Sequence, residues 1–215
     1  MPEQHSTLRE QRRAETQRMI QRHAVRLFTE RGYSATTVTD VAEAAGVSPM
    51  TVYRHFPTKE DLVLVDQHAR ILAERITATP AGQPLVSRIG RALIDSAATL
   101  TGEGDDDGDG AADRRFLLAR LQLMISTPAL RARHLDAHYA LQQAIVDALG
   151  DEAGDPDSAF QAQAAAGASL AALHTALVRW AEDDGRTRLP DLIAKALGAA
   201  FGDDVVAPAG SAEAQ

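Results

Sequence analysis

The 215-residue sequence contains no cysteine. This absence excludes disulfide bridges, cysteine-based zinc fingers and thiol nucleophiles. Aromatic residues make up only 4% of the chain, so the core must be built mainly from aliphatic side chains. No apolar run is long enough to cross a membrane, and the first residues, MPEQHSTLREQRRAET, are too polar for a signal peptide. We therefore expect a cytoplasmic protein that has no membrane contact and needs no cofactor.

The formal net charge is −8, but the charge is unevenly distributed. Residues 1–60 contain nine Arg and Lys against seven Asp and Glu, whereas residues 61–215 contain thirteen against twenty-three. This asymmetry weakly favours the N-terminal segment as the part that faces a polyanion such as nucleic acid.

Apolar residues recur every three or four positions along nearly the whole chain, which is the period of an amphipathic α-helix. No segment shows the bounded alternation of a β-strand. The predicted fold is therefore all-α, with about nine helices. Beyond residue 61 the predicted helices span 62–76, 85–100, 113–126, 128–149, 156–182 and 190–201.

The segment GVSPMTVYRHFPTKED, residues 46–61, predicts a very short helix with a distinctive outward face. Ser48 fits the N-cap, and Pro49 fits the first helical position, where no backbone N–H is needed. Val52 and Phe56, four residues apart, form the inward stripe at 100° per residue. The outward and flanking positions hold uncharged or cationic side chains, namely Met50, Thr51, Tyr53, Arg54 and His55.

A second short helix precedes this one and completes a helix-turn-helix pattern. Thr37 to Asp40 fit a capping box, and Gly46 fits the turn between the helices. In this motif the second helix enters the major groove of DNA and its N-terminal side chains reach base edges. A net negative charge is compatible with DNA binding, because phosphate contacts need only a few donors on one face. The alternative is a helical hairpin in which Tyr53, Arg54 and His55 are ordinary surface residues.

Residues 22–64, RHAVRLFTERGYSATTVTDVAEAAGVSPMTVYRHFPTKEDLVL, resemble the DNA-binding domain of the tetracycline-repressor (TetR) family of bacterial regulators nearly position for position. The shared pattern includes LFTERGY, the Thr-Thr-Val before the second helix, VAEAAGVS and YRHFPTKEDL. The resemblance implies a repressor that binds a palindromic double-stranded DNA operator as a homodimer and is released by a small-molecule effector. Met50 departs from the family pattern, which frequently has a small residue there.

The resemblance also implies roles for individual residues. Thr37 and Ser48 would cap helices and touch phosphates, and Thr39 would lie at the groove-facing start of the second helix. Residues 49–51 would lie nearest the bases, and Lys59 would bind phosphate from the fourth helix. The full predicted set of DNA-contacting residues is Thr37, Thr39, Ser48, Pro49, Met50, Thr51, Tyr53, Arg54, His55 and Lys59.

Four parts make up the predicted organisation. They are a flexible arm over residues 1–15, a TetR-type helix-turn-helix domain over 16–61, a helical regulatory and dimerisation domain over 62–201, and a disordered tail over 202–215. The arginines of the arm would either reach DNA or remain solvated; they are Arg9, Arg12 and Arg13.

The family dimerises through its last two long helices, here predicted at 156–182 and 190–201. Small residues there would let helices approach closely and leucines would supply apolar contact, although a plain core helix fits the same composition. The predicted interface residues are Ala164, Gly167, Ala168, Leu170, Ala171, Leu177, Leu192, Ile193 and Leu197.

The family also binds its effector among the middle helices, with the predicted helix 62–76 as the lever to the DNA-binding domain. A mostly apolar cavity with a few polar anchors is expected, and core packing is the alternative role of each apolar candidate. The candidate pocket residues are Leu72, Leu93, Phe116, Leu121, Met124, His138, Tyr139, His174 and Trp180.

Two patterns suggest metal binding, and the sequence favours neither. His134 and His138 are four residues apart on a predicted helix but lack the glutamate of a zinc-protease motif and an evident third ligand. The Asp-rich segment from Asp105 to Asp113 follows the spacing of a calcium loop, but Phe116 occupies its last ligand position. We therefore expect no metal.

Two alternatives to a ligand-controlled regulator remain. One is a helix-turn-helix regulator that works without a small-molecule effector or through a protein partner. The other is a helical enzyme that uses pocket histidines, which is disfavoured because the sequence has no Gly-rich phosphate loop, no Gly-x-Ser-x-Gly motif and no cysteine. An enclosed apolar cavity in the C-terminal domain would favour effector binding.

Overall fold

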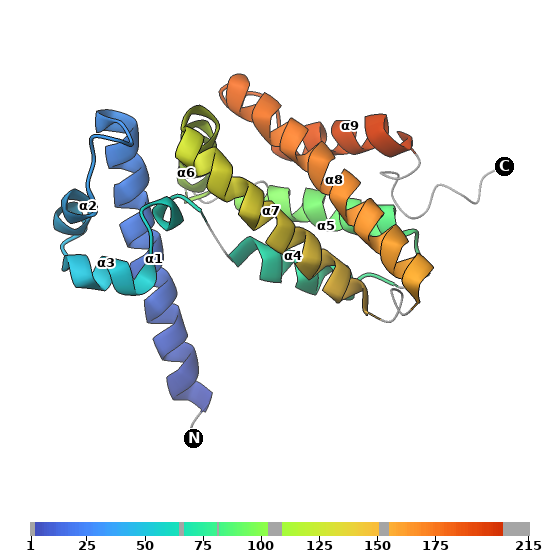
Figure 1. Ribbon diagram of the computed structural model, residues 1–215, viewed down its shortest axis with the longest axis horizontal. Coiled ribbons are helices and arrows are strands. Elements are labelled where there is room, and N and C mark those ends of the chain that lie inside the picture. Colours follow the sequence, from blue (N-terminus) through green and yellow to red (C-terminus); the bar gives the residue numbers. More distant parts are fainter. Residues whose placement is uncertain (1–2, 65–66, 81, 103–108, 151–154, 204–215) are drawn as a thin grey trace. The chain divides into compact units, whose positions relative to one another are not determined.

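The computed structural model describes residues 3–64, 67–80, 82–102, 109–150 and 155–203. Within these ranges the chain forms nine α-helices and one 3-10 turn and no strand, which confirms the all-α prediction (Figure 1). The elements are α1 (Glu3–Arg31), α2 (Val38–Ala44), α3 (Pro49–His55), η1 (Glu60–Leu62), α4 (Gln67–Thr77), α5 (Leu85–Leu100), α6 (Asp109–Ser126), α7 (Pro128–Leu149), α8 (Pro156–Glu182) and α9 (Leu189–Phe201).

The chain divides into two compact units. The first unit contains Met1–Val65 and Gln122–Arg133, and the second contains Asp66–Leu121 and His134–Gln215. Helix α6 therefore begins in the second unit and ends in the first, and α7 returns to the second. The sequence-based boundary at residue 61 did not include the segment 122–133 in the DNA-binding part, because periodicity shows which face of a helix is buried but not what covers it.

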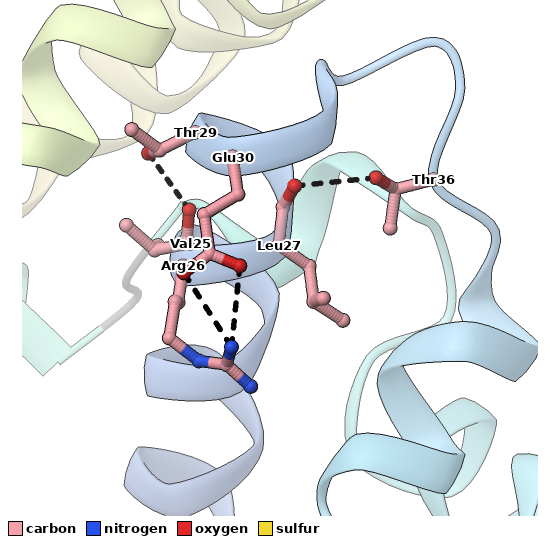
Figure 2. Close-up of polar contacts among 6 residues, drawn as sticks. All are labelled: Val25, Arg26, Leu27, Thr29, Glu30 and Thr36. Carbon is pink, nitrogen blue, oxygen red and sulfur yellow. Dashed lines mark hydrogen bonds and ion pairs between the residues drawn. The ribbon is translucent and has the colours of Figure 1, made fainter.

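In the first unit α1 packs against α2 and η1. Ile20, Leu27 and Phe28 of α1 are buried in its core. Polar contacts also fix the chain to α1: the buried Thr36 hydroxyl donates to the Gly32 and Leu27 carbonyls at 3.0 and 3.4 Å, the latter drawn in Figure 2. These contacts position α2 and η1 relative to α1, and α3 packs in turn against α2.

Two predictions for the first 76 residues are corrected by the structure. In place of a flexible arm over 1–15, α1 is helical from Glu3, as the strong helix formers Glu, Gln, Arg and Leu in this segment permit. The single helix predicted over 62–76 is divided into η1, which ends at Leu62, and α4, which begins at Gln67. The apolar residues keep their helical spacing across this break, so the sequence pattern did not reveal the break. Of the tail predicted over 202–215, residues 204–215 lie outside the described residues.

In the second unit α5, α8 and α9 pack against one another (Figure 1). Gly90 of α5 lies so close to the Leu197 side chain of α9 that a β-carbon at this position would be 3.1 Å from Leu197 Cδ1. Helix α8 begins with Asp155 as N-cap and Pro156 at the first turn. None of the helices in the described ranges has both the length and the apolar character needed to cross a membrane.

Candidate nucleic-acid interface

Helix α2 and the turn after it form as their sequence predicts. The Thr37 hydroxyl accepts from the Asp40 backbone N–H at 3.1 Å, and the Asp40 carboxylate accepts from the Thr37 N–H at 2.7 Å, which completes the capping box. Gly46 follows with φ of +66°, a left-handed conformation that favours glycine. The Val47 N–H then bonds to the Ala42 carbonyl at 3.0 Å, so the direction in which the chain enters α3 is fixed.

Helix α3 is anchored by two apolar residues and capped by Ser48. The Ser48 hydroxyl accepts from the Thr51 N–H at 3.1 Å, and Pro49 occupies the first turn. Val52 is fully buried and Phe56 is nearly so, which confirms the inward stripe. Because these anchors lie four residues apart, the opposite face of the helix is presented to solvent.

The outward face is accessible in the way that DNA reading requires. Met50 is 76% exposed and Tyr53 is 51% exposed, and Arg54 is exposed as well. Ser48 and Pro49 are exposed, whereas Thr51 and His55 are half-buried on the flank. No acidic residue lies in the first turn of α3. A surface of this kind can approach phosphates without charge repulsion.

The hydrogen bonds within the site leave different donors available. The single Thr37 hydroxyl proton goes to the Asp40 carboxylate at 2.7 Å, so Thr37 has no hydroxyl proton to donate to a phosphate. Ser48 and Thr51 share one hydrogen bond between their hydroxyls at 2.9 Å, which leaves one of their two protons free. Within the described residues the side chains of Thr39, Tyr53 and Arg54 make no hydrogen bond, so these three retain their full donor capacity.

His55 lies next to cationic groups from two helices. Partial burial lowers its pKa below the ordinary value, and the charges of Arg54 and Arg13 lower it further. The imidazole is therefore neutral at pH 7, and its Nδ1 is buried without a partner within the described part of the chain. Arg13 is part of α1, which brings it near α3, and does not belong to a flexible arm.

Lys59 makes contacts within the first unit that its predicted role in phosphate binding did not include. Its ammonium group donates a hydrogen bond to the Tyr33 carbonyl and lies 4.2 Å from the Tyr33 ring centroid and 5.4 Å from that of Phe28. Desolvation lowers its pKa, while the Glu60 charge acts in the opposite direction. Lys59 also precedes a 3-10 turn and not a fourth α-helix. This lysine therefore stabilises the first unit, which reduces its freedom to bind phosphate.

The Tyr33 side chain completes this cluster. Its hydroxyl donates to Glu60 Oε1 at 2.7 Å, and burial together with the Glu60 carboxylate raises the tyrosine pKa. The ring packs at 5.0 Å from that of Phe28. Because Phe28 is in α1 and Glu60 is in η1, the cluster joins these two elements.

The candidate pocket residues do not gather around one described opening. Tyr139 is 72% exposed, and Met124 belongs to the first unit, unlike the other candidates. Trp180 is fully buried, and its Nε1 donates to the Thr187 carbonyl at 2.9 Å in the turn before α9, so it serves packing. Leu72, Leu93 and Leu121 are buried, and Phe116, His138 and His174 are half-buried or exposed.

An open groove of about 650 Å³ lies between α4 and α7 in the second unit. Its lining includes Arg70, Glu74, Thr77 and Asp147, and none of the candidate pocket residues contributes to it. Charged side chains at an open rim are unlike the enclosed apolar cavity expected for an effector.

The predicted dimer residues divide into three groups. Leu170, Ile193 and Leu197 are buried within the protomer and have no surface to offer a partner. Gly167 faces Gln142 of α7, whose side chain would be 3.1 Å from an added β-carbon. The remaining residues keep surface on α8 or α9; they are Ala164, Ala168, Ala171, Leu177 and Leu192.

The rings of His134, His138 and His174 lie close together, but they are not arranged around a metal ion. No group of three potential ligands among the described residues could hold a metal. Of the Asp-rich segment, residues 105–108 lie outside the described residues, and Asp109, Gly110 and Asp113 lie in α6.

Comparison with known proteins identifies the family and the fold. Residues 20–65 match the model of the TetR family of bacterial regulatory proteins, and residues 108–200 match the model of the MftR C-terminal domain. The chain belongs to the TetR family. This TetR-family chain is a DNA-binding transcriptional regulator.

Its relatives are transcriptional regulators, in agreement with the expectation that the chain is not an enzyme. TcmR of Streptomyces glaucescens is 34% identical over 60% of this chain, which spans 56% of that regulator's length. MftR of Mycobacterium tuberculosis, a regulator named for mycofactocin biosynthesis, is 26% identical over 91% of each chain.

Solved structures share the fold. FadR of Thermus thermophilus, a TetR-family repressor in complex with lauroyl-CoA, is 25% identical with a TM-score of 0.52 and covers 91% of this chain and 98% of its own. FadR of Bacillus subtilis, in complex with stearoyl-CoA, has a TM-score of 0.55 at 19% identity, over 86% of this chain and 97% of its own. The second likeness concerns the fold alone.

Proposed function

We propose that this TetR-family regulator represses transcription by binding a two-fold symmetric DNA site as a homodimer, and that a small-molecule effector releases it. The observation that carries the proposal is the outward face of α3. Met50, Tyr53 and Arg54 are exposed there, and Tyr53 and Arg54 have no competing hydrogen bond within the described residues. Exposed donors on a short capped helix suit insertion into a major groove.

An exposed apolar strip on α8 supports the homodimer. Phe160 is 71% exposed, and Ala164, Ala168 and Ala171 follow it at helical spacing with their side chains on the surface. A single α3 reads only a few base pairs, so a dimer is needed for specificity. Small exposed residues at this spacing would let α8 approach its symmetry mate closely.

The proposal of an effector draws on the relatives. Thermus FadR is a repressor whose crystal structure contains lauroyl-CoA, and it aligns over nearly its whole length. An effector of the acyl-CoA class is therefore the first candidate to test. Any effector must bind the free protein more tightly than the DNA-bound form, because only differential affinity shifts the equilibrium.

The DNA-contact proposal is tested by Arg54→Gln. Loss of one phosphate contact should weaken binding to DNA of any sequence and reduce the slope of log K against log salt by about 1. Fluorescence anisotropy would measure affinity at several salt concentrations for a random duplex and for fragments selected from genomic DNA.

Arg26→Gln is the matched control, because Arg26 is an exposed α1 arginine that pairs with Glu30 at 3.2 Å (Figure 2). This variant should bind like the wild type. If Arg54→Gln keeps the wild-type affinity on every duplex, α3 does not read DNA in the proposed way. If it loses affinity only for the selected fragments, Arg54 contacts a base and not a phosphate.

A further inference from the structure

Three histidine rings meet in the second unit. His134 and His138 are in α7 and His174 is in α8. The rings of His134 and His174 stack with centroids 5.5 Å apart and an interplanar angle of 28°. The rings of His134 and His138 meet edge to face at 6.2 Å. His174 is exposed, so the cluster is open to a solute.

Arg120 of α6 adds a permanent positive charge to this cluster. The pKa of His134 is lowered mainly by burial, and further by the charges of His174, His138 and Arg120, so Arg120 lies near the His134 ring. The surrounding protein desolvates the guanidinium and lowers its pKa to about 10, so it remains charged at neutral pH. Within the described residues no hydrogen bond or ion pair reaches its side chain. The sequence analysis did not single out Arg120, because a lone arginine on a helix carries no spacing signal.

Arg120 is half-buried, and a partly desolvated arginine without an anionic partner is less stable than one that is paired. Burial lowers the pKa of His134 and His138, so these imidazoles can donate N–H groups at neutral pH but bring no compensating charge. The arrangement therefore lacks a negative charge. A cation would make the imbalance worse, and no group of three potential ligands in the described part of the chain could hold a metal ion.

We propose that Arg120, His134, His138 and His174 form a binding site for the oxyanion group of an acidic small molecule, either a carboxylate or a phosphate. This inference rests on the proposed function, since it supplies the polar anchor of the effector. The guanidinium would bind two oxygens of the anion side by side, and the imidazoles would donate further hydrogen bonds. Three helices, α6, α7 and α8, would thereby be joined through one ligand.

The position of the site gives it a route to the DNA-binding unit. His134 directly follows Arg133, which is the last residue of the segment that belongs to the first unit. Arg133 forms an ion pair with Asp61 at 3.5 Å. A ligand that draws α7 toward α6 and α8 would therefore act on His134, which is next in the chain to the ion pair between Arg133 and Asp61.

The first test measures anion binding to the full-length protein free of DNA. Imidazole NMR signals of His134, His138 and His174 would be followed while inorganic phosphate is added at constant ionic strength. Phosphate should raise the pKa of His134 and His138, because a bound anion stabilises the protonated form against the effects of burial, His174 and Arg120. Binding should consequently tighten as the pH falls from 8 to 6.

Arg120→Gln should weaken phosphate binding about tenfold or more, as loss of a charge-assisted bidentate contact does. Arg186→Gln, which removes an exposed arginine paired only with Asp184 among the ion pairs described, should leave binding unchanged. Circular dichroism and thermal unfolding of both variants would check that they fold. If Arg120→Gln folds and binds phosphate as tightly as the wild type, the site is not there.

The source of the oxyanion is distinguished by calorimetry with sodium laurate and with lauroyl-CoA. Tight binding of laurate that depends on Arg120 identifies a carboxylate, whereas binding of lauroyl-CoA alone identifies the phosphates. Binding of Zn²⁺ in place of any anion, with loss in His134→Gln, would overturn the proposal in favour of a metal site. DNA release is measured separately: anion binding without release contradicts the effector role and leaves the site intact.

Discussion

At the scale of single residues, hydrogen-bond partners decide which side chains remain available for DNA. The family resemblance implied a DNA contact for each of Thr37, Thr39 and Lys59, without distinguishing among them. The structure separates them, because Thr37 is engaged in its cap and Lys59 in the Tyr33 cluster, while Thr39 is exposed. Sequence patterns locate such residues, but they do not show which protons are already committed to a neighbour.

Lys59→Met should lower the stability of the protein by about 1–2 kcal/mol, because it removes a charged hydrogen bond and two contacts with aromatic rings while keeping the alkyl chain. Urea unfolding would measure the change. Lys195→Met is the matched control, since Lys195 is the other lysine of the chain and is exposed on α9. If Lys59→Met keeps its stability but shows a smaller salt slope on DNA, the lysine is a phosphate ligand instead.

At the scale of elements, helix ends were the most predictable features. The caps at Thr37 and Ser48 and the start and end of α7 and α8 agree with the sequence prediction. Capping residues, prolines and glycines act locally, so their effect can be read from a few neighbouring positions. The division between η1 and α4, and the helical start of α1, depend on packing and on summed propensity, which local patterns express weakly.

Substitutions at Thr37 and Thr39 distinguish the contribution of α2 to stability from its contribution to DNA binding. Thr37→Val should destabilise the protein by about 1 kcal/mol through loss of its cap. Thr39→Val should leave stability within about 0.5 kcal/mol, since it is an exposed substitution, but should weaken DNA binding. Thermal unfolding and anisotropy on the same samples would measure both quantities. Equal effects of the two substitutions on DNA affinity at equal stability would contradict the assignment.

At the scale of the whole molecule, the exposed strip of α8 is the surface that the proposed dimer must cover. Ala168→Arg places a long charged side chain in the middle of this strip. We expect it to convert the dimer to a monomer and to abolish specific DNA binding, because one α3 alone reads too short a site.

Light scattering and sedimentation would measure the oligomeric state of Ala168→Arg. Ala111→Arg, at an exposed alanine near the start of α6, is the control and should remain dimeric. A dimeric Ala168→Arg with unchanged DNA affinity would place the interface elsewhere.

The largest shortfall of sequence reasoning also lies at this scale. The family resemblance and the composition of α8 and α9 together predicted an interface that includes Leu170, Ile193 and Leu197, but these three residues are buried in the core of the protomer. A helix that packs on one neighbour and one that packs on a second copy have the same period. Only the burial of each residue within the protomer distinguishes the two cases.

The path of α6 and α7 through both units has a practical consequence for anyone who wishes to isolate the DNA reader. A fragment that stops at Val65 would leave behind residues 122–133, including Leu130, which is fully buried. Such a fragment would have a cavity in its hydrophobic core and would lack the ion pair between Arg133 and Asp61. Chimaeras between relatives would need to exchange both stretches of chain together, because the reader is assembled from two places in the gene.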